Sequence, residues 1–175
     1  MQKEYKINQV NPSKGALDFS YLLDAPAGKH GFVQAKNGHL YYEDGTRARF
    51  LGFNMATRSN AVNHELAEKL AGRFASLGVN VIRLHAADAI GEQERSWSSC
   101  KEAPLLDYEK GTSRFFHPEG LDRFDYFVAK LKEKGIYIHI DLIVAREFLL
   151  GDELDYDTKV ASCSKCYPMF NERLI

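Results

Sequence analysis

The sequence has 175 residues, of which 45% are hydrophobic and 27% charged, a balance typical of one globular domain with enough apolar residues for a core. Because 23 Lys and Arg stand against 24 Asp and Glu, the formal net charge of -1 gives no whole-chain field to attract nucleic acid or an anionic membrane. No apolar run approaches the roughly 20 residues of a membrane helix, so an uncharged partner fits the composition best.

Residues 1–31 precede the first regular pattern, and we treat them as an N-terminal extension. Lys3 and Lys6 lie close to the N-terminus, but no apolar segment follows them, so the sequence shows no secretory signal. We therefore expect either a cytoplasmic protein or a secreted one whose signal has been removed.

Alternating apolar and polar residues over 32–53 predict a small antiparallel β meander. The dipeptides Asn37-Gly38 and Asp44-Gly45 interrupt the alternation, and both suit the positive φ angles of tight hairpin turns. The meander leads into a strand predicted over 49–54.

A helix is predicted next, because Asn63 can cap its N-terminus and Gly78 stands where a left-handed residue would end it. A strand predicted over 79–85 follows. The apolar stripe of the helix recurs at helical spacing and consists of Leu66, Leu70, Phe74 and Leu77.

The same helix and strand pattern then returns. Pro118 suits the first turn of a second helix, Gly135 ends it, and residues 136–142 predict another strand. The apolar stripe of this helix consists of Leu121, Phe124, Val128 and Leu131. Two segments with the same order of helix, glycine and strand indicate parallel strands joined by right-handed crossovers.

The predicted fold class is therefore α/β. Three parallel strands cannot close on themselves, whereas a closed barrel needs about 250 residues. We expect residues 32–175 to form the N-terminal portion of a (β/α)8 TIM barrel catalytic domain. This portion would contain the meander and the first three β/α units, and it would end before the fourth strand.

Two long loops follow the second and third strands, over 86–117 and 145–170. Long loops at this end of parallel strands are usually functional. Trp97 and Tyr108 in the first loop could stack on sugar rings or simply pack the loop, and they are candidate substrate-binding residues. The acidic residues Asp152, Glu153, Asp155 and Asp157 in the second loop predict a solvated segment.

Strand periodicity decides which side chains face away from the helices. Ile82 and Leu84 suit the helix side, which turns Arg83 and His85 to the other face. The same alternation turns Asn54 and Asp141 to that face in the neighbouring strands. We expect these four polar residues, Asn54, Arg83, His85 and Asp141, to cluster at the C-terminal ends of adjacent strands.

An inward-facing arginine needs an anionic partner, because an unpaired buried charge is unstable. Arg83 could pair with Asp141 for structural reasons, or it could hold a catalytic carboxylate ionised. His85 could contact substrate or be a satisfied polar residue. For His139, deeper in its strand, a structural role is favoured.

Three motifs occur in the order found in the cellulase-like glycoside hydrolases of clan A. They are RFLGFN over 49–54, GVNVIRLH over 78–85 and LDRFDYF over 121–127. The resemblance extends over about residues 20–145. It implies a retaining hydrolase that acts on β-linked glycosides or polysaccharides, with Arg83 in place of the second-strand arginine beside the nucleophile.

The resemblance also implies that no catalytic residue lies in this chain. The acid/base of these hydrolases comes from an Asn-Glu pair ending the fourth strand and the nucleophile from a Glu ending the seventh, both expected beyond Ile175. Asn171-Glu172 has no strand-like run before it and is not assigned as the acid. Ile143 occupies the place of a third-strand histidine often seen in these families. We expect the chain alone to be inactive.

No metal or cofactor is expected. Cys100, Cys163 and Cys166 are too few for a disulfide scaffold or a four-ligand zinc site. Two alternatives stay open: a doubly wound nucleotide-binding domain, although no glycine-rich phosphate loop is present, and a non-catalytic carbohydrate-binding or interaction module. Exposed sheet surfaces could also let the isolated chain dimerise.

Overall fold

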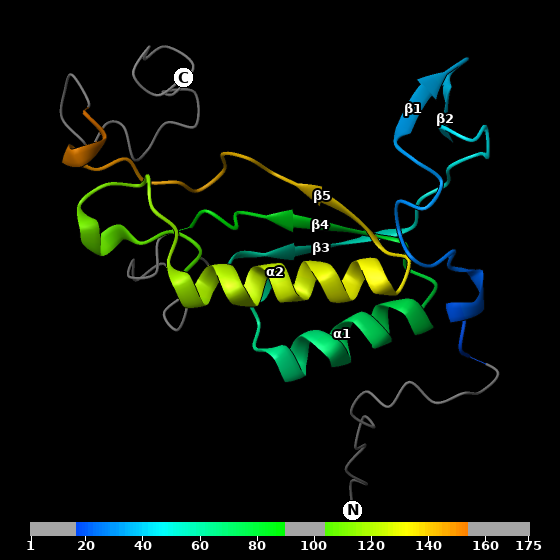
Figure 1. The fold of residues 1–175 in the computed structure, drawn as a ribbon, viewed down its shortest axis with the longest axis horizontal. Coiled ribbons are helices and arrows are strands. Elements are labelled where there is room, and N and C mark those ends of the chain that lie inside the picture. Colours follow the sequence, from blue (N-terminus) through cyan, green and yellow to red (C-terminus); the bar gives the residue numbers. More distant parts are fainter. Residues whose placement is uncertain (1–16, 90–103, 154–175) are drawn as a thin grey trace, which may run out of the picture.

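The computed structural model describes residues 17–89 and 104–153, which form a mixed α/β unit (Figure 1). Its five strands are β1 (Val33–Lys36), β2 (His39–Tyr42), β3 (Gly52–Ala56), β4 (Val81–His85) and β5 (Tyr137–Ile140). Its helices are α1 (His64–Ser76) and α2 (Pro118–Glu133), with short 3-10 turns η1 (Ser20–Leu22), η2 (Thr57–Asn60), η3 (Tyr108–Lys110) and η4 (Leu150–Asp152). None of the helices in these two ranges is long and apolar enough to cross a membrane.

Strands β3, β4 and β5 form one sheet in that order, and both pairings are parallel, as the sequence predicted. The register places Asn54 opposite Arg83 and Arg83 opposite His139. Both helices lie on one face of this sheet (Figure 1). Within the described ranges, the three strands form an open sheet and not a closed barrel.

The strands are shorter than the sequence predicted, and β3 begins three residues later than the expected residue 49. The side chain of Asn80 explains this difference. Its amide oxygen accepts from the Leu51 N–H at 2.7 Å, and its NH2 donates to the Arg49 carbonyl at 2.7 Å. The side chain of Asn80 therefore holds the segment before β3, together with backbone hydrogen bonds from the N–H groups of Asn80 and Val81 to the Leu51 carbonyl.

The predicted meander is only a two-stranded hairpin. At its turn Asn37 and Gly38 have φ angles of 51° and 74°, the positive values expected for this dipeptide. The third segment contributes a single bridge between Tyr41 and Arg47, after which the chain leaves for the parallel sheet. The prediction of a meander running directly into β3 was wrong in this respect.

The helix termini follow the sequence prediction. The Asn63 side chain accepts from the Leu66 N–H at 2.9 Å, and Pro118 occupies the first turn of α2. Gly78 and Gly135 follow the helices with φ angles of 72° and 82°. These left-handed residues let the chain turn directly into β4 and β5.

The buried face of α1 is not the predicted stripe. Ala67, Ala71 and Ala75 form it, whereas Leu66 is 42% exposed and Leu77 is also exposed. Leu70 and Phe74 pack only at its margin. Small alanine side chains let the helix approach its neighbours closely, and a stripe defined by large residues misses them.

In α2 the structure buries Leu131 as predicted and adds Phe127, which the predicted stripe left out. Both pack in a core shared by the sheet and the two helices. Its other fully buried apolar members are Ala67, Ala71, Val79, Ile82, Leu84 and Ile136.

Candidate functional site

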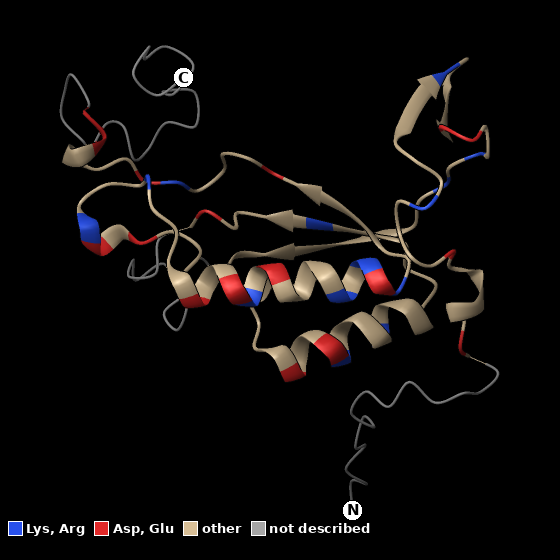
Figure 2. Ribbon diagram, viewed as in Figure 1, with Lys and Arg blue, Asp and Glu red and all other residues tan. Residues whose placement is uncertain are grey.

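Four polar side chains meet where the parallel strands end. Asn54 comes from β3, Arg83 and His85 from β4, and Asp141 follows β5 directly. Figure 2 shows the basic segment within β4 beside the acidic segment just past β5. Because Ile82 and Leu84 are fully buried under the helices, strand alternation turns Arg83 and His85 to the open face. The structure thus brings the four predicted residues together.

Asp141 is the centre of this polar cluster. The Arg83 guanidinium donates from Nε to Oδ1 at 3.2 Å and from Nη2 to Oδ2 at 2.6 Å, which is the bidentate geometry of a strong ion pair. Nη1 of Arg83 donates to the Asn54 side-chain oxygen at 3.4 Å. Nδ1 of His85 lies 2.6 Å from Oδ2 of Asp141.

These contacts decide the charge of Asp141. Its side chain is 12% exposed, and burial alone would raise its pKa. The hydrogen bond with His85 and then that with Arg83 outweigh burial and hold the pKa of Asp141 below its usual range. Asp141 is therefore ionised at neutral pH, and the pairing of Arg83 with Asp141 is the arrangement that the geometry shows.

His139 is less engaged than its place in the strand suggested. Its side chain is 65% exposed, and its Nε2 lies 3.5 Å from Oδ1 of Asp141. This distance is too long for a strong hydrogen bond. His139 contributes at most a weak electrostatic contact to the polar cluster.

Hydrogen bonds tie together the segments that follow β4 and β5. The Tyr108 hydroxyl donates to the Asp88 carbonyl at 2.9 Å and accepts from the Glu147 N–H at 3.3 Å. The Asp88 carboxylate accepts from the N–H groups of Val144 and Ala145 at 2.8 and 3.0 Å. Burial raises the pKa of Tyr108. The hydroxyl of this candidate sugar-binding residue is thus used to join the loops.

Asp155 and Asp157 lie outside the described residues, and Glu153 is exposed as predicted. The prediction of a solvated acidic segment is wrong for Asp152. Its side chain is fully buried and accepts from the Thr112 hydroxyl at 2.6 Å and from the N–H groups of Ser113 and Leu149 at 3.0 and 2.8 Å. Burial pushes its pKa up, but these donors outweigh it and lower the pKa of Asp152. No local sequence signal marks this contact, because Thr112 lies 40 residues away.

Several candidates from the sequence lie outside the described residues. These are Trp97, the Asn171-Glu172 pair and the three cysteines, Cys100, Cys163 and Cys166. Within the ranges that are described, no group of three His, Cys, Asp or Glu is arranged to hold a metal ion.

The opposite end of the sheet is built from aromatic rings. Tyr137, the first residue of β5, stacks on Tyr42 at 5.5 Å and meets Phe50 edge-on at 5.6 Å between ring centroids. Burial is the main reason why the pKa of Tyr42 rises to about 12. His30 also stacks on Tyr42 and binds the carboxylates of Asp24 and Asp44.

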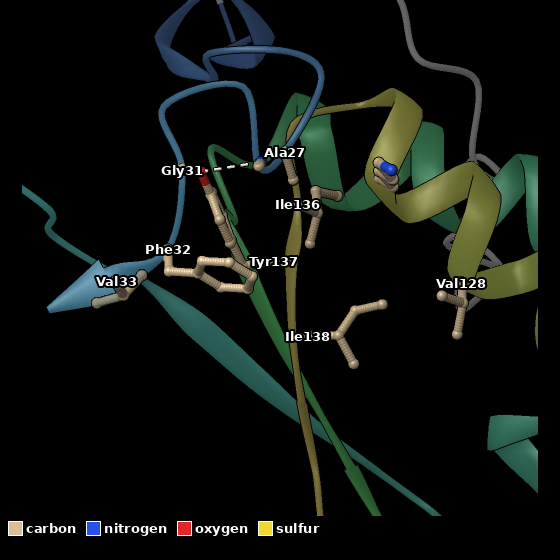
Figure 3. Close-up of a pocket in the computed structure, with 10 residues that line it drawn as sticks. Ala27, Gly31, Phe32, Val33, Val128, Ile136, Tyr137 and Ile138 are labelled. Carbon is tan, nitrogen blue, oxygen red and sulfur yellow. Dashed lines mark hydrogen bonds between the residues drawn. The ribbon is translucent and has the colours of Figure 1, made fainter. Parts of the chain in front are cut away.

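A cavity of about 400 Å³ lies beside these rings (Figure 3). Its lining includes Phe32 and Val33 from the hairpin, Val128 from α2, and Ile136 and Ile138 around the start of β5. The lining is mostly apolar, and Lys132 and Tyr137 are its polar side chains. The polar cluster at the other end of the strands instead brings an arginine, a histidine and a carboxylate together, and it is the candidate site.

No family model and no curated protein matches this chain. Solved structures that match include a glycoside hydrolase of family 5 from Bacteroides vulgatus, with 15% identity and a TM-score of 0.47. Another, named glycoside hydrolase, has 18% identity and a TM-score of 0.47. Each match covers 67% of this chain and 26% of the other, so the chain spans about a quarter of their length. Likeness at this level carries no argument about fold or activity.

Proposed function

We propose that the polar cluster is part of the active site of a cellulase-like glycoside hydrolase of clan A. One observation carries the proposal: Asn54, Arg83, His85 and Asp141 converge at the C-terminal ends of three adjacent parallel strands. Barrel enzymes build their active sites at this end of the strands. The sequence resemblance over residues 20–145 supports the same assignment.

The proposal includes the fold of the whole protein. Strands β3, β4 and β5 would be the first three strands of a (β/α)8 barrel, with α1 and α2 in its outer layer. The buried side chains Ile82 and Leu84 face these helices, while Arg83 and His85 occupy the face that would line the barrel. Residues 32–175 would then belong to the catalytic domain.

Within this site Asp141 suits a supporting role. Retaining hydrolysis needs one carboxyl group to protonate the leaving oxygen and another about 5 Å away to attack the sugar. Asp141 is the cluster's carboxylate, and its charge is already matched by Arg83. The two catalytic glutamates would come from residues beyond Ile175, as the resemblance implies. The substrate would be a β-linked glycoside or polysaccharide, and its hydrolysis would need no cofactor.

Hydrolysis of aryl β-glycosides and β-glucans tests the proposal. The 175 residues alone should show no turnover above background, whereas a longer chain that adds the two glutamates should be active. In that longer chain Arg83→Ala should lower kcat/KM by about 100-fold or more, because the hydrogen-bond donors that Arg83 presents at the active site are lost.

Arg123→Ala is the matched control, since Arg123 lies on α2 and pairs with Glu119 away from the cluster. Its activity should stay within about twofold of the unmodified enzyme. Turnover by the 175 residues alone, or full activity of the Arg83→Ala enzyme, would show that the active site is wrongly assigned.

A further inference from the structure

We infer that Asp141 is a positioning residue that fixes the proton of His85 on Nδ1, so that Nε2 of His85 accepts a hydrogen bond from a hydroxyl group of an uncharged sugar. This inference rests on the proposed function and names the class of ligand that the site takes. It follows from the contacts of three residues, Arg83, His85 and Asp141.

The first step concerns the His85 ring. An ionised carboxylate accepts hydrogen bonds and cannot donate them. Because Oδ2 of Asp141 lies 2.6 Å from Nδ1 of His85, that nitrogen must carry the proton. In the neutral ring the other nitrogen, Nε2, is then an acceptor, and the described residues provide no hydrogen-bond donor to it.

The second step concerns Arg83. Its Nε and Nη2 donate to Asp141, and its Nη1 donates to Asn54. Each terminal nitrogen carries two N–H groups, so one on Nη1 and one on Nη2 have no partner among the described residues. The Arg83 side chain is 44% exposed and can present these donors to a ligand.

Together the two residues offer donors and an acceptor side by side. A sugar hydroxyl is both a donor and an acceptor, so a pair of neighbouring hydroxyls can satisfy Arg83 and His85 together. A carboxylate ligand would find the Arg83 charge already matched by Asp141 and would face the lone pair of His85 Nε2. The cluster therefore favours a neutral sugar over an acidic one.

NMR of the 175-residue chain with 15N-labelled histidine tests the positioning step directly. With the ring in its neutral form, established by titration in the same spectra, long-range proton–nitrogen correlations show which nitrogen carries the proton. In the unmodified chain His85 should carry it on Nδ1. In Asp141→Ala the preference should be lost, because the carboxylate that holds the proton is gone.

Asp122→Ala is the matched control. Asp122 lies 2.9 Å from Nε2 of His64 on the outer helix layer, so its removal should change the signals of His64 and leave His85 unaltered. If Asp141→Ala fails to fold, Asp141→Asn and the unmodified chain still decide the matter. A proton on Nε2 of His85 in the unmodified chain, or an unchanged His85 in a folded Asp141 variant, would overturn the inference.

Titration of the longer chain, which adds the two glutamates, with cellotetraose and with its uronate analogue separates this inference from the proposed function. The neutral sugar should shift the His85 Nε2 signal at lower concentration than the uronate does. Tighter binding of the uronate would refute the ligand class. If the proton sits on Nδ1 but neither sugar shifts the signal, the proposed function fails while the positioning role of Asp141 stands.

Discussion

The two ends of the parallel sheet are held by different chemistry. At the N-terminal ends of the strands Tyr137 stacks on Tyr42, and Phe50 meets both rings edge-on. At the C-terminal ends Arg83 and Asp141 form an ion pair in which the Arg83 side chain is partly exposed to solvent. Aromatic burial contributes net stability in proportion to the area removed from water, whereas partly exposed ion pairs contribute about 0–1 kcal/mol. We therefore expect the aromatic residues at the N-terminal ends of the strands to stabilise the fold more than the ion pair does, and the residues at the C-terminal ends to bind ligand.

The chain before the hairpin strengthens the N-terminal end. The Phe19 N–H donates to the Ser76 carbonyl at 2.9 Å, and the Ala27 N–H donates to the Lys132 carbonyl at 2.9 Å. Gly135 passes so close to this segment that an added Cβ would lie 3.0 Å from the Ala25 nitrogen. The segment thus anchors the ends of both helices beside the aromatic rings.

The largest effect expected from this comparison is a difference between two alanine substitutions. Tyr42→Ala should lower the free energy of unfolding by about 2–3 kcal/mol, because the ring contacts Tyr137, Phe50 and His30. Arg83→Ala should lower it by about 1 kcal/mol or less. Urea unfolding of both variants measures the difference, and an equal or larger loss in Arg83→Ala would contradict the comparison.

A smaller effect is expected at the loops that follow β4 and β5. Asp152→Ala should favour local opening by about 1–2 kcal/mol, because Thr112, Ser113 and Leu149 keep buried donors with no acceptor. Hydrogen exchange of the amides in 104–117 measures this opening. Glu109→Ala, at an exposed position in the same loop, is the control and should leave their exchange unchanged.

The smallest effect concerns His30 at the aromatic end. Hydrogen bonds with Asp24 and then Asp44 raise the pKa of His30 above its ordinary value of 6.5. Because its pKa is raised in the folded state, the protonated His30 stabilises the fold. This contribution to the free energy of unfolding is complete below pH 6.5 and is lost as the pH rises through the higher pKa of the folded state. Each carboxylate has a pKa below its ordinary 3.8, so its own contribution is lost only as the pH falls below that value.

Thermal unfolding of the unmodified chain and of His30→Gln, followed from pH 4 to pH 9, measures this contribution. The difference in Tm should be greatest between about pH 4 and pH 6.5 and should shrink above that range. Lys29 also pairs with Asp24. Asp44→Asn should remove part of the same pH dependence, and identical profiles for all three chains would rule out the role of His30.

The sequence predicted the elements whose determinants are local. Asn63, Gly78, Pro118 and Gly135 mark helix ends through their own backbone preferences, and all four stand where the structure ends or begins a helix. Strand alternation likewise predicted that Arg83 and His85 share the face opposite Ile82. A residue's direction within a strand depends only on its position, so this part of the site could be predicted.

Other features depend on contacts between distant segments, and only the tertiary structure decided them. The buried face of α1 is set by how closely Ala67 and Ala71 let it approach its neighbours, and Asp152 is buried because donors 39 and 40 residues away converge on it. The sequence by itself determined the order of elements and the polar face of the sheet. The packing of the helices and the pairing of Arg83 with Asp141 depend on distances between segments, which no local pattern encodes.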